Sequence, residues 1–303
     1  MDVSGLSPTI VEKVDRISEI LVGIGEDPLL RDGLSLYGGT ALNFLHFQGT
    51  PRLSEDLDFN YRHRSSEDWG DVRSEVDDRL KGILHGLGYD DDQFRIQPKY
   101  NIGRFHVKYT NSEGLGDTLK VEIGYTRRMP ILREDALLEF RHPLSEVSVP
   151  ITTPAREEIF ANKFCTMLAR KGPAAYVRDV FDVATMSRFE VDASLLVDIV
   201  MVESLMCELD LPNVQFRPMA MEQMGLLRSM VSHNVDIEEI RRMAAEHTEG
   251  ILSKCREREW DDFSERFWQT GAIDNGGFEN PEEMNPDIED HPLLLWIRKK
   301  RKL

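Results

Sequence analysis

The sequence predicts an α+β fold in which a lobe of mixed helices and strands is followed by a mostly helical lobe. In the first part of the chain, apolar residues recur at helical spacing over residues 8–22. Apolar and polar residues then alternate, as they do in half-buried strands, over residues 53–59, 105–109 and 119–125. After about residue 150 this alternation ends, and helical spacing continues to about residue 270. The change of pattern predicts the two lobes.

Cap and turn residues mark the boundaries of these elements. The serine pair at 65–66 suits the N-cap of a helix that ends at Gly88. Thr153-Pro154 suits the start of the first helix of the second lobe. The segment 276–292 is rich in Gly, Pro, Asn and acidic residues, which is typical of an acidic loop or a mobile linker. We therefore expect a lobe over residues 1–150, a helical lobe over residues 151–275, and an acidic linker with a basic tail over residues 276–303.

The composition is that of an ordinary globular protein from a reducing compartment. The 303 residues are 41% hydrophobic and 30% charged, and no apolar run approaches the ~20 residues that span a bilayer. No secretory signal is visible, and the three cysteines match no disulfide or zinc spacing. We therefore expect a cytoplasmic protein without a membrane partner. The net charge of −17 argues against nucleic-acid binding over the whole surface, although local basic groups can dominate a contact.

Two aspartates, Asp56 and Asp58, form the strongest candidate site. Successive side chains of a strand point to opposite faces, so both carboxylates share one face with Ser54. Leu57 and Phe59 then enter the core. Two like charges this close are costly unless a cation neutralises them, and oxygen ligands of this kind suit Mg²⁺. The alternative is a solvated strand face. Three nearby arginines are candidates for binding phosphate groups: Arg52, Arg62 and Arg64.

A Gly-Gly-Thr turn lies 16 residues before the aspartates. Gly38, Gly39 and Thr40 lead into a helical stretch, and backbone N–H groups at the start of a helix can bind phosphate groups. A pair of glycines is also common in ordinary turns. The order and spacing of the turn and the Asp-x-Asp pair indicate nucleotidyl transfer more strongly than either motif alone.

Together the two motifs resemble those of the AbiEii/MenT-type nucleotidyltransferases, which are toxins of toxin–antitoxin and phage-defence systems. The resemblance rests on Gly38-Gly39-Thr40-Ala41-Leu42, followed by Arg52-Leu53-Ser54-Glu55-Asp56-Leu57-Asp58-Phe59. It extends to Lys163 and to Arg178-Asp179 followed by Asp182, and so covers about residues 30–190. The common superfamily pattern has a Gly-Ser pair and a shorter gap before Asp-x-Asp. The departure at Thr40 fits the toxin branch.

The resemblance implies a polymerase-beta-like nucleotidyltransferase fold with a mixed β-sheet. It implies that Asp56 and Asp58 bind Mg²⁺, or Mn²⁺, and that the glycine turn and Arg52 hold an NTP. Ser54 joins the nucleotide-binding set because it shares the face of the aspartates, a position that would also suit a silencing phosphorylation. The resemblance further implies an RNA acceptor, with the 3′ end of tRNA favoured, and a cognate antitoxin. Two alternatives stay open: a nucleotidyltransferase that modifies a protein or a small molecule, and a nucleotide-binding regulator without catalysis.

Glu122 is the candidate for a third carboxylate. It lies on the strand face opposite Val121 and Ile123, and it joins the aspartates if its strand pairs near theirs. The polymerase-beta-like superfamily commonly has a carboxylate on a later strand, so the resemblance supports this role. A solvated glutamate beside Lys120 is the alternative.

Three charged residues of the second lobe complete the candidate site. Lys163 falls inside the apolar stripe of its helix, where a charged amine is costly unless it is paired. It either reaches solvent along its stem or, as the resemblance implies, contacts the triphosphate. Asp179 and Asp182 lie one turn apart on the next helix, and an exposed acidic pair is the simple interpretation. The resemblance implies a functional role, with Asp182 first and Asp179 orienting Lys163 or another basic residue.

Overall fold

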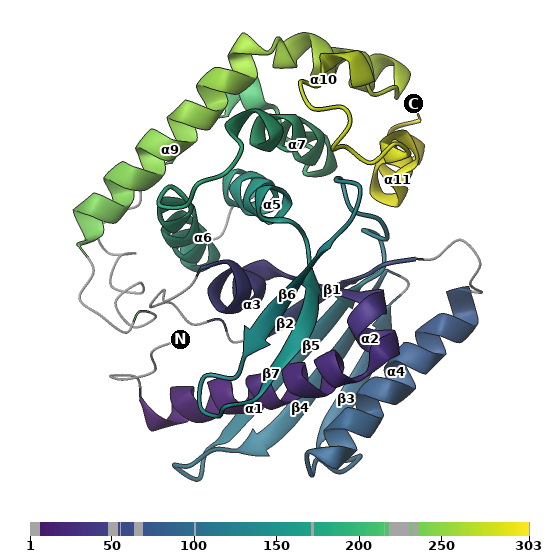
Figure 1. Cartoon of the computed structure of the whole chain (residues 1–303), viewed down its shortest axis with the longest axis vertical. Coiled ribbons are helices and arrows are strands. Elements are labelled where there is room, and N and C mark those ends of the chain that lie inside the picture. Colours follow the sequence, from purple (N-terminus) through teal and green to yellow (C-terminus); the bar gives the residue numbers. More distant parts are fainter. Residues whose placement is uncertain are drawn as a thin grey trace. The chain divides into compact units, whose positions relative to one another are not determined.

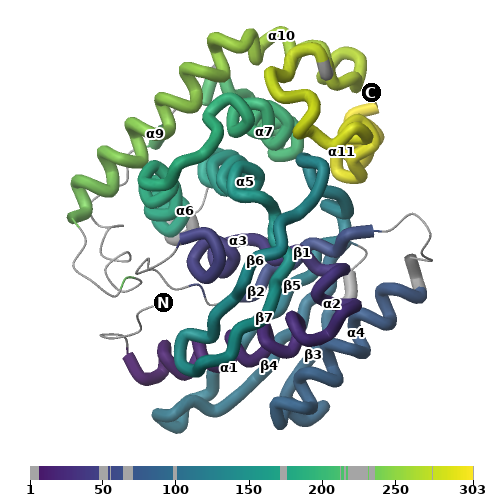
Figure 2. The backbone as a smooth tube through the Cα atoms, viewed as in Figure 1, coloured from purple at the N-terminus to yellow at the C-terminus, as the bar shows by residue number. Residues whose placement is uncertain are grey.

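The chain forms two compact units in the computed structural model. The first consists of Met1–Met129 and Asp135–Pro154, and the second of Pro130–Glu134 and Ala155–Leu303. Figure 1 labels the elements of both units, and Figure 2 follows the backbone from the purple N-terminus to the yellow C-terminus. The division into segments 1–150, 151–275 and 276–303 stays a prediction about domains. The structure describes residues 7–47, 54, 56–63, 69–99, 101–170, 173–214, 216–217, 231 and 236–302.

The first unit is built around a mixed sheet, as predicted, and this sheet has five strands. Its strand order is β1-β2-β5-β4-β3, in which β2 and β5 are parallel and the other neighbours antiparallel. The strands of the unit are β1 (Leu34–Tyr37), β2 (Asp56–Tyr61), β3 (Phe94–Lys99), β4 (Ile102–Thr110), β5 (Gly116–Gly124), and the hairpin β6 (Ala136–Arg141) and β7 (Ser148–Thr153). Its helices are α1 (Pro8–Glu26), α2 (Pro28–Gly33), α3 (Gly38–Ala41) with the π-helical turn η1 (Leu42–His46), and α4 (Trp69–Gly86).

Local sequence explains where these elements begin. Ser7 caps α1 by accepting the N–H of Ile10, and Asp27 caps α2 by accepting those of Leu29 and Leu30. The serines predicted to cap α4 lie outside the described residues. Four strands were not predicted, namely β1, β3, β6 and β7. In β3 the run Phe94–Lys99 contains Pro98, which argues against a central strand, but β3 is an edge strand and tolerates it.

The two faces of the sheet differ in polarity. The alternation predicted for β2, β4 and β5 is present, and the apolar side chains of each strand are buried on one face. Helices α1 and α4 pack on this face, because Arg16 of α1 lies 4.4 Å from the ring of Tyr109 and Arg73 of α4 lies 4.6 Å from the ring of Tyr125. In Figure 1, α1 runs across the strands. The opposite face, here called the polar face, carries Asp56, Asp58, Asn60, Arg95, Arg104, His106, Lys108, Lys120 and Glu122.

The register of the sheet therefore decides where the acidic residues lie. Leu57 and Phe59 are almost fully buried, whereas Asp56 and Asp58, which alternate with them, are partly exposed. A slip of one residue would carry both carboxylates into the core. Burial of each large apolar side chain contributes about 1.5–3 kcal/mol, so the core residues hold the carboxylates on the polar face.

The second unit is helical, as predicted. Its main helices are α5 (Arg156–Ala169), α6 (Pro173–Met186), α7 (Ala193–Met206), α9 (Ile237–Glu257), α10 (Trp260–Thr270) and α11 (Pro292–Arg301). The prediction that Thr153-Pro154 begins the first of them was wrong. Thr153 ends β7, and its hydroxyl donates to the carbonyl of Leu36 at 2.9 Å, so its oxygen stabilises the sheet instead of capping a helix. Within the described residues, no helix combines the length and apolar content of a membrane crossing.

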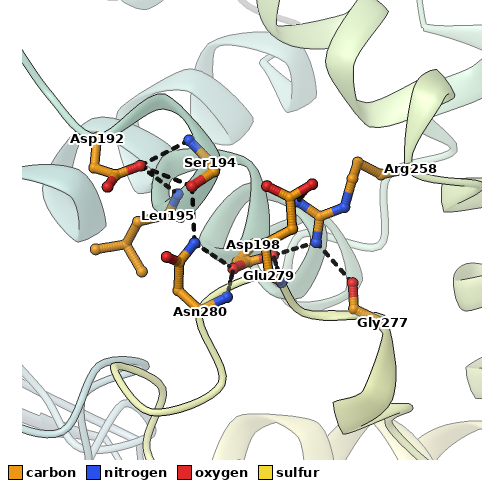
Figure 3. A network of polar contacts seen from close by, with 8 residues as sticks. All are labelled: Asp192, Ser194, Leu195, Asp198, Arg258, Gly277, Glu279 and Asn280. Carbon is orange, nitrogen blue, oxygen red and sulfur yellow. Dashed lines mark hydrogen bonds and ion pairs between the residues drawn. The ribbon is translucent and has the colours of Figure 1, made fainter.

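The segment 276–292, predicted to be a mobile linker, is packed against its own unit. Phe278, Met284 and Ile288 are buried, which the acidic composition of the segment concealed. Figure 3 shows the polar anchor of the segment. The fully buried Asp198 of α7 accepts hydrogen bonds from the backbone N–H of Asn280 at 2.9 Å and from Arg258 at 2.5 Å. A buried carboxylate requires such donors, and the segment supplies them.

Candidate active site

The pairing of β2 with β5 brings three carboxylates together. In this parallel pair Asp58 lies opposite Glu122, and Asp56 lies opposite Lys120. Alternate residues of a strand, and residues directly opposite each other in a pair of strands, share a face. Asp56, Asp58 and Glu122 therefore all lie on the polar face. The condition that the sequence set for Glu122, pairing of its strand near that of Asp58, is therefore met. Its catalytic role stays a prediction.

The cations that face these carboxylates are held only weakly. Arg104 Nε lies 2.9 Å from Glu122 Oε1, and Lys120 Nζ lies 3.8 Å from Asp56 Oδ1. The two carboxylate side chains are 28% and 38% exposed, respectively. Ion pairs exposed to this extent contribute about 0–1 kcal/mol, so a ligand can replace either cation at little cost. The carboxylate oxygens are thus accessible to a metal ion or to a proton of a substrate.

The glycine turn packs directly against Asp58. Gly38 has φ = +73°, a conformation that favours glycine, and a Cβ placed there would lie 2.7 Å from Asp58 Oδ2. Both the backbone conformation and the available space therefore require glycine at this position. Helix α3 starts at Gly38 and continues into η1, and Tyr37 before it supplies no side-chain cap. The start of α3 at Gly38 therefore lies next to the carboxylate of Asp58.

The remaining motif residues hold the turn in place. Thr40 is fully buried, and its hydroxyl donates to the carbonyl of Asp56. Asn43, which the sequence analysis did not single out, donates from Nδ2 to the carbonyl of Gly39 at 2.6 Å. The hydroxyl of Thr40 therefore joins the helix to β2. Any phosphate contact made by Thr40 would have to come from its backbone N–H.

The basic residues predicted near the aspartates have different positions. Arg62 binds Asp135 through two nitrogens, at 2.6 and 2.7 Å, and also donates to the carbonyl of Arg127. Its guanidinium thus joins the end of β2 to a later loop, which corrects its assignment as a phosphate-binding group. Ser54 is half-buried just before β2. Arg52 and Arg64 lie outside the described residues.

A second group of charged residues lies in the second unit. Lys163 Nζ is 2.8 Å from Asp179 Oδ1 and 2.9 Å from Asp182 Oδ2, and Arg170 Nε is 3.1 Å from Asp179 Oδ2. Both aspartates are buried, so the prediction of an exposed acidic pair was wrong. The reason is that α6 is covered on two sides, by α5 and by α9, which places its polar side against α5. The pairing with aspartates also explains how Lys163 is accommodated in an apolar stripe.

A third group, Asp15, Glu19 and His142, has ligand atoms within 4.8 Å of one another. His142 is buried, and its Nε2 lies 3.5 Å from Asp15 and 3.4 Å from Glu19. Its Nδ1 accepts the N–H of Leu144 at 3.1 Å, so the neutral ring carries its proton on Nε2. A protonated nitrogen has no lone pair for a metal. The group is therefore a buried histidine whose Nε2 lies near two carboxylates of α1 without a hydrogen bond to either, among the residues that the structure describes.

The mixed sheet, the Asp-x-Asp pair and the adjoining glycine turn are the features of a nucleotidyltransferase. The chain belongs to the family described as the nucleotidyl transferase AbiEii toxin of type IV toxin–antitoxin systems, whose model matches residues 19–268. This membership confirms the resemblance and the enzyme class. It also implies a nucleotide substrate and an antitoxin partner. Nucleotidyltransferases generally use divalent metal ions.

Solved structures show similarity at low sequence identity. The nucleotidyltransferase toxin MenT4 from Mycobacterium tuberculosis is 16% identical, with 81% of this chain and 96% of that chain covered and a TM-score of 0.41. An antigenic nucleotidyltransferase-like protein from Paracoccidioides brasiliensis is 15% identical, with 74% and 96% covered and a TM-score of 0.40. No curated protein matches the chain.

Proposed function

We propose that the chain transfers a nucleoside monophosphate from an NTP to an RNA acceptor, with the 3′ end of tRNA as the expected site, and that Mg²⁺ supports the reaction. The observation that carries the proposal is the register of β2 and β5, which sets Asp58 opposite Glu122 with Asp56 on the same face. The contact of Gly38 with Asp58 supports it, because it brings the start of a helix to the carboxylates.

The donor set fits a hard divalent cation. Asp56 and Asp58 provide carboxylate oxygens, which Mg²⁺ and Mn²⁺ accept, and Glu122 provides a third in register. When bound, the ion would neutralise phosphate charge and offset the charge that develops at the α-phosphate. The absence of a side chain at Gly38 leaves space beside Asp58 Oδ2 that a Cβ would occupy. We therefore assign the metal to Asp56 and Asp58, not to the group at His142.

The residues near the carboxylates have the following proposed roles. The backbone N–H groups of Gly38, Gly39 and Thr40 would donate to the phosphates. Asp58 or Glu122 would accept the proton of the acceptor hydroxyl. The acceptor oxygen then forms a bond to the α-phosphorus, the bond from that phosphorus to the β-phosphate breaks, and pyrophosphate leaves.

The residues of the second unit enter the proposal as one group. Asp179 and Asp182 hold the ammonium group of Lys163 at 2.8 and 2.9 Å, and its third N–H would donate to a phosphate oxygen. Arg52 and Ser54 remain proposed nucleotide contacts on the strength of their place in the motif.

The test is transfer of label from each α-³²P-NTP, in turn, to total tRNA in the presence of Mg²⁺. We expect label on tRNA with one nucleotide, and none after chelation of the metal. Asp58→Ala should lower the rate on the order of 10²–10³-fold, the cost of removing one electrostatic group at a reacting centre. The matched control is Asp92→Ala, an exposed aspartate of the same unit.

Other outcomes would overturn parts of the proposal. Full activity of Asp58→Ala would remove the assigned site. Label on protein or on a small molecule instead of tRNA would replace the RNA acceptor. Nucleotide binding without release of pyrophosphate would indicate a regulator that lacks catalysis.

A further inference from the structure

The polar face carries basic residues next to the candidate active site. Lys120 lies opposite Asp56 on β5, His106 lies opposite Lys120 on β4, and Arg95 lies opposite His106 on β3. Lys108 follows His106 by two residues on β4 and shares its face. These four residues, Arg95, His106, Lys108 and Lys120, are here called the basic patch. The register thus sets three members of the patch in one row that begins at Asp56.

The basic patch is exposed and poorly neutralised. Arg95, Lys108 and Lys120 are exposed, and His106 is half-buried. Among the residues that the structure describes, Arg95 and Lys108 have no ion-pair partner, and Lys120 has only the distant contact with Asp56. Three cations of the patch therefore lack a close carboxylate within the described part of the chain, and their positive charge is not neutralised there in the free protein. A bound polyanion would neutralise it.

This arrangement is unusual for a chain with a net charge of −17. Several basic residues elsewhere in the first unit are paired with carboxylates, as Lys13 is with Asp117 and Arg79 is with Asp27 and Glu75. In an acidic protein, positive potential survives only where such partners are absent. The basic patch meets this condition beside the carboxylates that we assign to catalysis.

The sheet also separates the patch from the glycine turn. In the order β1-β2-β5-β4-β3, the turn follows β1 on one side of β2, and the patch begins on β5 on the other side. The two substrates of a transfer reaction must meet at the α-phosphate from different directions. With the NTP phosphates at the glycine turn, the side of β5, β4 and β3 is left for the acceptor.

We propose that the basic patch binds the sugar-phosphate backbone of the acceptor nucleic acid and directs its end to Asp56 and Asp58. This inference rests on the proposed function. From β5 to β3 there are two strand spacings of about 4.8 Å, or about 10 Å in all. At about 3.4 Å of rise per nucleotide in a stacked strand, the patch would contact about three nucleotides. Contacts of this kind recognise phosphate groups and carry no base specificity.

The experiment measures RNA binding without turnover. The whole chain carries Asp58→Ala, the probe is a short single-stranded RNA with a 5′ fluorescein, and Kd is measured over a series of salt concentrations. Arg95→Gln together with Lys108→Gln should weaken binding. It should also lower the slope of log Kd against log salt by about 1.4, because each phosphate contact to a single strand contributes about 0.7.

The matched control removes two cations from a second cluster of basic residues, at the end of α11. Lys299 and Lys302 are exposed at the end of α11, and their replacement by Gln removes the same charge. We expect the control to retain the slope and affinity of the parent. An equal loss in the control, or an unchanged slope in the Arg95/Lys108 variant, would overturn the inference. Equally tight and patch-dependent binding of polyglutamate would also overturn it, in favour of an acidic protein partner.

The outcome is separable from that of the proposed function. If wild-type protein labels tRNA but the Arg95/Lys108 variant binds RNA as the parent does, only the basic patch is misassigned. If no RNA is labelled in the transfer assay, the proposed function fails whatever the binding assay shows.

Discussion

The carboxylates of the two units differ in how they are neutralised. In the first unit, Asp56 and Glu122 lie on the polar face of a sheet, partly exposed, each near one partly exposed cation. In the second unit, Asp179 and Asp182 are buried between helices and share the amine of Lys163. Both groups lie in motifs that resemble functional motifs of one family. Their surroundings give them different chemical capacities.

The difference shows which acidic residues are available for ligand binding. An exposed ion pair contributes little, so its carboxylate can exchange one cation for another. A buried pair costs several kcal/mol to break, because the remaining charge is left without a partner in a poorly solvated place. The carboxylates of β2 and β5 can therefore accept a metal ion in the folded protein. Those of α6 are bound to their lysine.

The largest effect that follows from this comparison is on stability. Lys163→Met would leave two buried carboxylates without their shared cation, and we expect it to lower the free energy of unfolding by about 3–5 kcal/mol in urea titrations. Lys299→Met, at an exposed position, should change it by about 0.5 kcal/mol or less. Adding Asp179→Asn and Asp182→Asn to Lys163→Met should recover part of the loss. Wild-type stability of the single variant would show that the buried group is as weakly coupled as the exposed one.

A smaller effect on stability is expected from replacing glycines that have positive φ. Comparing two of them separates the cost of backbone strain from the effect of contact with Asp58. Gly38 and Gly88 both have positive φ, +73° and +84°, but only Gly38 lies against Asp58, whereas a Cβ at Gly88 would meet nothing within 4 Å. Replacement of either by Ala should cost about 1–2 kcal/mol of stability from the left-handed backbone. Gly38→Ala should in addition displace Asp58 and lower nucleotidyl transfer by about 10²-fold, since small misplacements at a reacting centre have effects of this size.

The assay for this pair combines urea unfolding with the rate of label transfer from NTP. Gly88→Ala should retain the wild-type rate while losing stability. If Gly38→Ala also keeps the full rate, the contact with Asp58 has no bearing on the chemistry.

Parts of this molecule could be predicted from sequence because they depend on local pattern. Alternation along β2 was enough to place Asp56 and Asp58 on one face, and helical spacing was enough to show that Lys163 lies in an apolar stripe. Glu122 could be named only conditionally, because its position beside Asp58 depends on which strands pair. No local pattern encodes that choice.

Other features depend on contacts between distant residues. The sequence could not show that Asp179 and Asp182 are buried. Their burial depends on the packing of both α5 and α9 against α6. The segment around Phe278 was interpreted as a mobile linker because its anchor, Asp198, lies 81 and 82 residues before the backbone N–H groups that it binds. The basic patch was missed for the same reason. Arg95, His106 and Lys120 come from three strands, and only the register brings them into one row.

The smallest expected effect concerns a carboxylate that is neither in an exposed ion pair nor in a buried one. Asp77 of α4 is half-buried, and its Oδ1 has no hydrogen-bond partner in the part of the chain that the structure describes. Burial raises the pKa of Asp77 above its ordinary value of 3.8, and the charge of Arg73 offsets this only in part. The folded protein then retains a proton that the unfolded chain has already lost. Stability is consequently lost as pH rises from about 3.8 through the pKa of the folded state.

Asp77→Asn removes this titration. We expect it to raise the free energy of unfolding at pH 7 by about 0.5 kcal/mol or less relative to wild type, and to have a smaller effect at pH 4. Urea titrations at the two pH values measure the difference, with the exposed Asp92→Asn as the control that should show no such dependence. An equal effect of Asp77→Asn at both pH values would mean that burial of this carboxylate has no energetic cost. Solvent exposure and ion-pair partners together would then be insufficient to rank the acidic residues of this chain by their effect on the free energy of unfolding.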